Sequence, residues 1–275
     1  KKTLNLNFGN SLKLIPIKSN LIDEIHKDKI VKRKPFYSLN SKSVGESHKS
    51  KINKVRNILK FKKADHLFIS SPENVAWLMN VRGYDNPTSP IPNARLLISK
   101  NKKLFLIVDE KIASKLIKEK KFQRNQIINP TRFEELIKKL RGNKFIIDAS
   151  SCSILNEKII KSNFNVIDDV DPCFKLKSVK NSVEIKNTIN AHIEDGLALT
   201  RFIYWIKNIN KKKITEIEAK NKLEKFRKLN NNYLFPSFDT IAGAGYHGAI
   251  IHYRVSKESN KTINKNDLFL CDSGG

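Results

Sequence analysis

Residues 243–275 read GAGYHGAIIHYRVSKESNKTINKNDLFLCDSGG, and this stretch holds two apolar runs that each lead to an ionisable side chain. The first run, 249–253, contains His252, and the second, 268–272, ends in Asp272. Short apolar runs bounded by glycine and polar residues are typical of buried strands, so both runs predict strands. Two strands that each deliver one ionisable group are a common way to build an active site. A lone histidine is more often a structural residue, so the pattern alone leaves both interpretations open.

Two helices are expected immediately before this stretch. Asn181 with Glu184, and Thr215 with Glu218, have the spacing of a capping box, in which two side chains bond the free amides at a helix start. Apolar residues at helical spacing follow each pair. In the first helix they are Ile185, Ile189, Ile193, Leu197, Phe202, Trp205 and Ile209, and in the second Ile217, Leu223, Phe226 and Leu229. We expect both helices to pack against a sheet that begins at Ser237.

Strands and helices alternate between residues 46 and 172. The predicted strands are 67–69, 95–99, 103–108, 144–148 and 165–170. Helices are predicted for 49–59, 110–119 and 155–161. Two further helices are predicted to start at Ser71 and Pro72, and at a capping box formed by Thr131 and Glu134. Such alternation indicates an α/β domain that ends near Asp171 and Pro172.

Residues 1–45 carry weaker patterns. Short strands are expected within 4–8 and 12–17, and one helical turn within 20–25. These elements are too few to close a core, so the segment is either a flexible arm or the tail of another domain.

The composition is that of a soluble globular protein. A chain of 275 residues is long enough for two domains, and no apolar run approaches the roughly 18 residues that cross a membrane. No charged-then-apolar leader with a small-residue cleavage site is present at Lys1, so nothing argues for export. Cys152, Cys173 and Cys271 are odd in number and lack metal-ligand spacing, so we expect free thiols and a cytoplasmic location.

The formal net charge of +26 raises the possibility of a nucleic-acid or anionic-membrane partner. Only ten of the 53 basic residues are arginine, however, and lysine makes poor bidentate contacts with bases and phosphates. The lysines are spread along the whole chain, as in proteins encoded by adenine- and thymine-rich genomes. We therefore expect no specific nucleic-acid or membrane partner.

Gly243, Gly245 and Gly248 have the spacing of a dinucleotide-binding loop. That loop must lead from a strand into a helix, whereas 249–253 predicts a strand. The glycines are better explained by a turn that lets a substrate approach the backbone. The aspartates within 168–171 lack the glycine and distal glutamate of a calcium loop and are expected to form a solvated turn.

Several segments resemble, in the same order, the three-domain cytosolic Xaa-Pro aminopeptidases of the pita-bread metallopeptidase family. The segments are NLID (20–23), ENVAWLMNVRGYD (73–85), KLKSVKN (175–181), FPSFDTI (235–241), GAIIHY (248–253) and LCDSG (270–274). The long helix around 191–196 is similar as well. The resemblance covers nearly the whole chain.

The resemblance implies a mixed α/β fold in three parts. Residues 1–45 would be the C-terminal remnant of a first creatinase-N-like domain, and 46–172 a second creatinase-N-like α/β domain. Residues 173–275 would be the N-terminal part of a truncated α+β pita-bread catalytic domain.

The resemblance also implies a function, namely metal-dependent release of the N-terminal residue from peptides with proline in second position. In the family two divalent metal ions, usually manganese, are held by two aspartates, a histidine and two glutamates, oxygen-rich ligands that suit a hard ion. Asp272 matches the first aspartate ligand, and His252 matches the histidine that binds substrate and transfers protons. The other ligands would lie past Gly275, so the 275 residues alone are expected to be inactive.

Some residues depart from the family pattern. Tyr246 and His247 replace a small or polar pair, and we expect His247 to be exposed; His26 stands where the family often has tryptophan. The alternatives are an Xaa-Pro dipeptidase or creatinase-like hydrolase, or a non-catalytic pita-bread binding protein. The expected partner is a peptide with proline in second position, and the family is commonly a homodimer.

Overall fold

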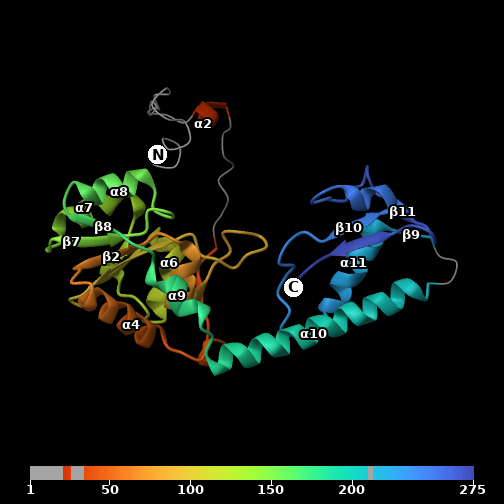
Figure 1. Ribbon diagram of the computed structural model, residues 1–275, viewed down its shortest axis with the longest axis horizontal. Helices are drawn as coiled ribbons and strands as arrows, with labels where there is room; N and C mark the ends of the chain where they lie inside the picture. Colours follow the sequence, from red (N-terminus) through yellow and green to blue (C-terminus); the bar gives the residue numbers. More distant parts are fainter. Residues whose placement is uncertain (1–20, 26–33, 210–212) are drawn as a thin grey trace.

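The computed structural model describes residues 21–25, 34–209 and 213–275. Two units lie at opposite ends of one long helix, α10 (Ser182–Lys207), as Figure 1 shows. The first unit is an α/β structure and the second a smaller mixed one. The α/β fold class predicted from the alternating pattern is confirmed.

The first unit is built on a six-stranded sheet in the order β6-β5-β4-β2-β7-β8. The strands are β2 (His66–Ile69), β4 (Arg95–Ser99), β5 (Leu104–Ile107), β6 (Ile127–Ile128), β7 (Lys144–Ile147) and β8 (Asn165–Asp168). β4 runs antiparallel to both β2 and β5, while the remaining pairs are parallel. The hairpin predicted between 95 and 108 is therefore confirmed at the middle of the sheet.

Helices cover both faces of this sheet because its strands are apolar on both sides. Leu67 and Ile69 pack into one core cluster and Phe68 into another, as the alternation of side chains along a strand requires. The first cluster includes residues of α4 (His48–Phe61), α5 (Pro72–Met79), α6 (Glu110–Lys118) and α9 (Pro172–Ser178). The second includes residues of α7 (Phe133–Lys139) and α8 (Ile154–Lys161). α9 packs on this unit, and its Cys173 is fully buried in the first cluster.

Two helix starts differ from prediction. α5 begins after Ser71 with Pro72 in its first turn, but the Ser71 hydroxyl makes no capping hydrogen bond. The capping box expected from Thr131 is wrong, because Asn129 takes the capping role instead. Its Oδ1 accepts from the Thr131 amide at 3.0 Å and starts the short 3₁₀ helix η3 (Pro130–Arg132), which leads directly into α7.

Shorter elements complete the first unit. They are β1 (Tyr37–Ser38), α3 (Ser41–Val44), β3 (Val81–Arg82) and η2 (Arg124–Gln126), with β1 paired to β3. The short helix α2 (Leu21–Ile25) is described separately from this unit, and its Leu21, Ile22 and Ile25 are exposed. α2 confirms the helical turn expected near residue 20. The strands expected within 4–8 and 12–17, and His26, lie outside the described residues.

The second unit contains α11 (Glu216–Arg227), η4 (Gly245–Ala249) and two antiparallel pairs, β10 (Ile241–Ala244) with β12 (Phe269–Asp272) and β9 (Ile214–Thr215) with β11 (Thr262–Ile263). Both predicted capping boxes are present at the starts of α10 and α11. The sheet begins at Ile241 rather than at Ser237. A small core of Phe202, Ala219 and Leu223 joins the two helices.

The expected packing of α10 on a sheet holds only for its C-terminal half. Ile185, Ile189 and Ile193 remain 49%, 55% and 63% exposed, although they continue the same apolar stripe. Helical spacing therefore predicted the helix correctly but did not predict what covers it. Within the described residues, no helix combines the length and apolarity that membrane crossing requires.

Candidate functional site

Asp272 lies at one end of the β10–β12 ladder. It pairs with Ile241, while Phe269 pairs with Ala244 at the other end. Phe269 and Cys271 pack toward the helical core, so the alternation along β12 turns Asp272 to the opposite, exposed side. Its carboxylate makes no hydrogen bond or ion pair with any other described residue, which leaves both oxygens open to a ligand.

The strand predicted for 249–253 is wrong. Residues 245–249 form the 3₁₀ helix η4, and the chain then turns, with His252 at a positive φ of 55°. Ile250 and Ile251 are 50% and 86% exposed, so the apolar run that suggested a buried strand is not buried among the described residues. The five-residue helix η4 begins at Gly245 itself and does not restore the dinucleotide interpretation, because that loop must lead into a longer α-helix.

η4 folds back tightly onto β10. A Cβ atom added at Gly243 would lie 2.9 Å from the backbone nitrogen of Gly248 and 2.9 Å from the carbonyl carbon of His247. Real side chains do not tolerate contacts this short with backbone, so glycine is required at 243. The close approach predicted for these glycines is therefore between two segments of the chain itself.

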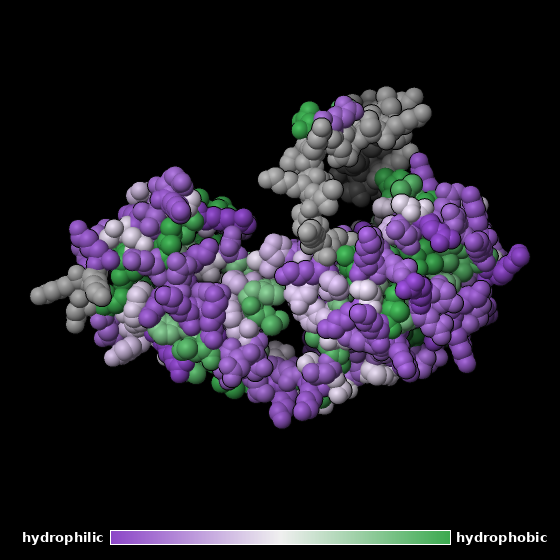
Figure 2. Space-filling view, turned by 180° about the vertical axis from the view of Figure 1, so that it is seen from behind, coloured by the Kyte–Doolittle hydropathy of each residue, from purple (hydrophilic) through white to green (hydrophobic). Residues whose placement is uncertain are grey.

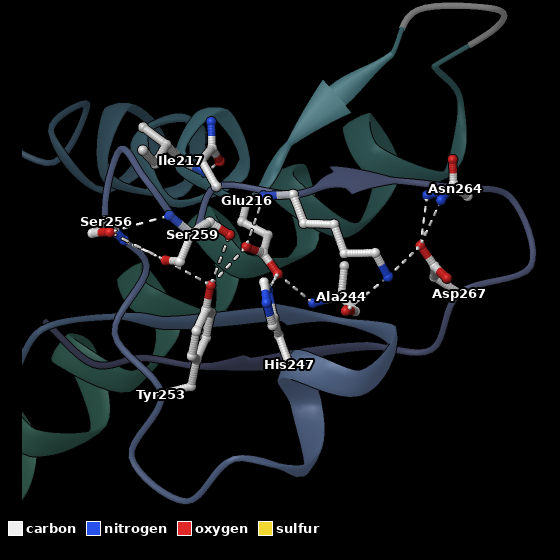
Figure 3. A network of polar contacts seen from close by, with 11 residues as sticks. Glu216, Ile217, Ala244, His247, Tyr253, Ser256, Ser259, Asn264 and Asp267 are labelled. Carbon is white, nitrogen blue, oxygen red and sulfur yellow. Dashed lines mark hydrogen bonds and ion pairs between the residues drawn. The ribbon is translucent and has the colours of Figure 1, made fainter.

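A buried carboxylate organises the segment that carries His252. Glu216, the first residue of α11, is fully buried, and its Oε1 accepts from the Ala244 amide at 2.7 Å and from His247 Nδ1 at 2.8 Å. Its Oε2 accepts from the Tyr253 hydroxyl at 3.0 Å and from the Lys261 amide at 3.1 Å. Figure 3 shows Ala244 at the end of β10, His247 of η4 and Tyr253 of the turn after it converging on Glu216. Lys261 comes directly before β11 in the chain.

The four donors decide the ionisation of Glu216. Burial opposes its charge, but the hydrogen bonds from Ala244, His247, Lys261 and Tyr253 outweigh burial and lower the pKa of the carboxyl. A charged carboxylate only accepts, so Nδ1 of His247 carries the proton that it donates. Burial and the contact with Glu216 also raise the pKa of the Tyr253 phenol, which keeps that hydroxyl a donor.

His247 was expected to be exposed, and this is wrong. It is 8% exposed, and its ring stacks on Tyr253 with centroids 4.5 Å apart. The reason is the buried acceptor on α11, which no local pattern around residue 247 reveals. A glutamate at a helix start is ordinarily interpreted as a favourable charge for the helix dipole, so Glu216 was missed as well.

A second buried charge contacts Ser273, the residue that follows Asp272. Arg227, the last residue of α11, donates from Nε and Nη2 to Asp195 of α10 at 2.7 and 3.1 Å, and from Nη2 to the Ser273 hydroxyl at 3.1 Å. Its side chain is 2% exposed, whereas that of Asp195 is 36% exposed. These contacts tie the residue after Asp272 to both helices. Sequence reasoning singled out neither Arg227 nor Asp195 for this role.

The structure does not join His252 and Asp272 directly. Both side chains are exposed, and no hydrogen bond or ion pair links them among the described residues. Nor do three or more His, Cys, Asp or Glu side chains come together to hold a metal ion in this part of the chain. Cys271, next to Asp272, is a poor ligand because burial raises the pKa of its thiol.

Comparison with known families gives two adjacent matches. Residues 28–184 match the family model "Creatinase/Prolidase N-terminal domain", and residues 186–275 match "Metallopeptidase family M24". The two matches meet at the start of α10, which is also where the first unit ends.

Individual relatives match nearly the whole chain. The chain is 33% identical to the Xaa-Pro aminopeptidase ApepP of Drosophila melanogaster, over 95% of this chain and 44% of that protein. Among solved structures, the X-prolyl aminopeptidase of Caenorhabditis elegans, described as a cytosolic enzyme with a di-nuclear active site, superposes with a TM-score of 0.86 at 26% identity. That superposition covers 99% of this chain and 46% of the other. An Xaa-Pro dipeptidase from Bacillus anthracis shares the fold at 20% identity, with a TM-score of 0.60 over 83% of this chain and 61% of that one. The chain thus spans less than half the length of the two aminopeptidases.

Proposed function

Because the chain belongs to the creatinase/prolidase N-terminal domain family and continues into a segment of metallopeptidase family M24, we propose that the whole protein is a metal-dependent aminopeptidase. Its substrates would be peptides with proline in second position, from which it releases the N-terminal residue. The observation that carries the proposal is the superposition of both units together on one X-prolyl aminopeptidase, over 99% of this chain. A relative that shared only one unit would not match both units and the helix between them.

The described residues supply one element of a metal centre. Asp272 offers two unpaired carboxylate oxygens on an exposed face of β12, and oxygen is the donor that hard divalent ions such as manganese prefer. One carboxylate does not hold two ions, and no cluster of three ligand side chains exists in the described residues. The described residues therefore lack the full set of ligands for a dinuclear metal centre. We propose manganese for the whole protein because hard divalent ions of this kind prefer oxygen ligands such as Asp272.

His252 is the residue that we assign to the substrate side. Its ring is exposed at a positive-φ turn, and its neighbour Tyr253 is held in place by the buried Glu216. An exposed imidazole on this turn can donate to or accept from a bound peptide and exchange a proton with it. This role does not require contact between His252 and Asp272.

The test compares this chain with a version that continues past Gly275 to the length of the relatives. Both are assayed on a peptide with proline second and on a matched peptide with alanine second, with added manganese and with chelator. We expect the longer version to cleave only the proline peptide and to lose activity with chelator, and the 275-residue chain to give no turnover. Absence of metal-dependent cleavage by the longer version would refute the function, and turnover by the shorter one would refute the role of Asp272.

An Xaa-Pro dipeptidase is the second candidate, supported by the fold shared with the Bacillus anthracis enzyme. Adding a dipeptide and a pentapeptide to the assay separates the two, because a dipeptidase cleaves only the former. We further propose a cytosolic location, as stated for the Caenorhabditis elegans enzyme, and a homodimer. Hydrophilic residues cover most of the face seen in Figure 2, in both units.

A further inference from the structure

Helix α11 carries a buried charge at each end. Glu216, its first residue, is fully buried, and Arg227, its last, is 2% exposed. The two positions are eleven residues apart, which corresponds to about 16 Å along the helix. Burial of a charge is costly unless hydrogen bonds compensate, so each residue must be judged by what it holds.

The two charges hold opposite ends of the same strand pair. Glu216 accepts from the amide of Ala244, where β10 ends, and from the hydroxyl of Tyr253, which adjoins His252. Arg227 donates to Ser273, which adjoins Asp272 at the other end of the ladder. Each proposed site residue is thus one position away from a side chain that α11 holds.

The remaining contacts make each attachment specific. At the first end, the Lys261 amide donates to Glu216, and the Lys261 carbonyl accepts from the Glu216 amide at 3.0 Å. At the second, the guanidinium of Arg227 is bidentate to Asp195, and its Nη1 is buried with no hydrogen-bond partner among the described residues. A buried donor without a partner lowers the stability of the folded chain. The contacts of Arg227 with Asp195 and Ser273 must offset this cost, so we interpret Arg227 by these contacts rather than by the stability of α11 alone.

We propose that α11 is a positioning helix, with Glu216 setting the segment that carries His252 and Arg227 setting the residue that follows Asp272. The importance of the two positions for catalysis rests on the proposed function, whereas the mechanical coupling does not. Neither residue is assigned contact with substrate or metal. If the two charges only stabilised the fold, their removal would loosen both ends of the ladder alike.

The experiment measures amide hydrogen exchange by NMR in the 275-residue chain with Glu216→Gln, Arg227→Lys and the control Lys225→Met, an exposed position on the same helix. The reporter amides are Ala244, held by Glu216, and Ser237, which donates to the Gly274 carbonyl at 3.0 Å beside Ser273. We expect E216Q to speed exchange at Ala244 by about tenfold to a hundredfold and to shift the ring resonances of His252, with little change at Ser237. R227K is expected to do the reverse, and K225M to change neither.

Equal acceleration at both reporters in either variant, or none at either, would overturn the proposal. Should E216Q or R227K fail to fold, Tyr253→Phe and Ser273→Ala each remove one hydroxyl at one end and are expected to give the same selective pattern, more weakly. In the longer version, E216Q and R227K are expected to lower kcat for the proline peptide while K225M does not. A selective exchange pattern without any peptidase activity would reject the proposed function and leave the positioning role standing.

Discussion

Replacement of Asp65 by asparagine tests how the first unit is held together. Asp65 lies just before β2, and its Oδ2 accepts from the amides of Asn143 and Lys144 at 2.7 and 2.9 Å. Its Oδ1 lies 2.6 Å from the ammonium of Lys100. One carboxylate therefore joins the chain before β2 to the start of β7, the parallel neighbour of β2, and to the hairpin after β4.

The magnitude follows from which of these contacts is exposed. The Lys100 side chain is 52% exposed, so the ion pair contributes at most about 1 kcal/mol. A hydrogen bond to a charged acceptor contributes about 1.5–3 kcal/mol and a neutral one about 0.5–1.5, so asparagine loses roughly 1 kcal/mol at each of the two amides. We expect D65N to lower the free energy of unfolding by about 2–3 kcal/mol and Lys100→Met to lower it by less than about 1.

The assay is urea unfolding followed by tryptophan fluorescence. Trp77 belongs to the first unit and Trp205 to the second, so a Trp205→Phe background leaves a signal from the first unit alone. Asp109→Asn serves as a matched control, because Asp109 also accepts from a backbone amide, that of Lys111 at 2.8 Å, but at an exposed helix start. Its expected cost is about 1 kcal/mol or less.

The pH dependence gives an independent check. Burial of Asp65 opposes its charge, but Lys100 and the two amides outweigh burial and hold the pKa of the carboxyl well below its usual range. The folded chain therefore stays ionised where the unfolded chain, with a pKa of about 3.9, takes up a proton. The stabilisation is present above about pH 4 and is lost as the pH falls toward the folded pKa, so the difference between wild type and D65N should be about 1 kcal/mol smaller at pH 3 than at pH 6. A difference that does not change with pH, or an equal loss in Lys100→Met, would refute the reasoning.

Three further predictions concern other parts of the chain. Leu223→Ala removes most of a fully buried side chain from the small core of the second unit and should lower the free energy of unfolding of this unit by about 3 kcal/mol. Urea unfolding measures this loss, and a loss below about 1 kcal/mol would contradict the prediction. Burial lowers the pKa of Lys121 to about 8, so the folded chain releases this proton before the unfolded chain does. Stability should rise from pH 8 to 10, and Lys121→Met should reduce that rise in pH-dependent melting curves. Among the thiols, Cys271 is partly exposed whereas Cys152 and Cys173 are buried, so a thiol reagent should label Cys271 first in the folded protein; equal rates would contradict the burial.

Local patterns predicted most of the elements in the first unit. Periodicity located the longer helices and strands between 46 and 172 but not the short elements β3, β6 and η2, and the two boxes at Asn181 and Thr215 were found at the expected helix starts. These features depend on residues within one or two turns of each other, so nearby sequence carries the necessary information. Asn129 and Thr131 are both residue types that can cap a helix start, and spacing alone did not reveal which of the two side chains would do so.

The roles of His252 and Asp272 in the candidate site stay predictions. The resemblance singled out His252 and Asp272, and the sequence alone also determined the amphipathic helices that precede them. The backbone around His252 and the burial of His247 were predicted wrongly. Both depend on Glu216, which is 31 residues from His247 and 37 from Tyr253 in the chain.

Only the tertiary structure decided which charges are buried and what they hold. An isolated glutamate or arginine on a helix is ordinarily solvated, and its position in the sequence does not show whether a distant strand will bring amides or hydroxyls to it. In this chain, folding brings Ala244 and Tyr253 to Glu216, and Ser273 to Arg227. Local sequence thus determined the elements, and the long-range hydrogen bonds of α11 determined how the residues of the candidate site are held.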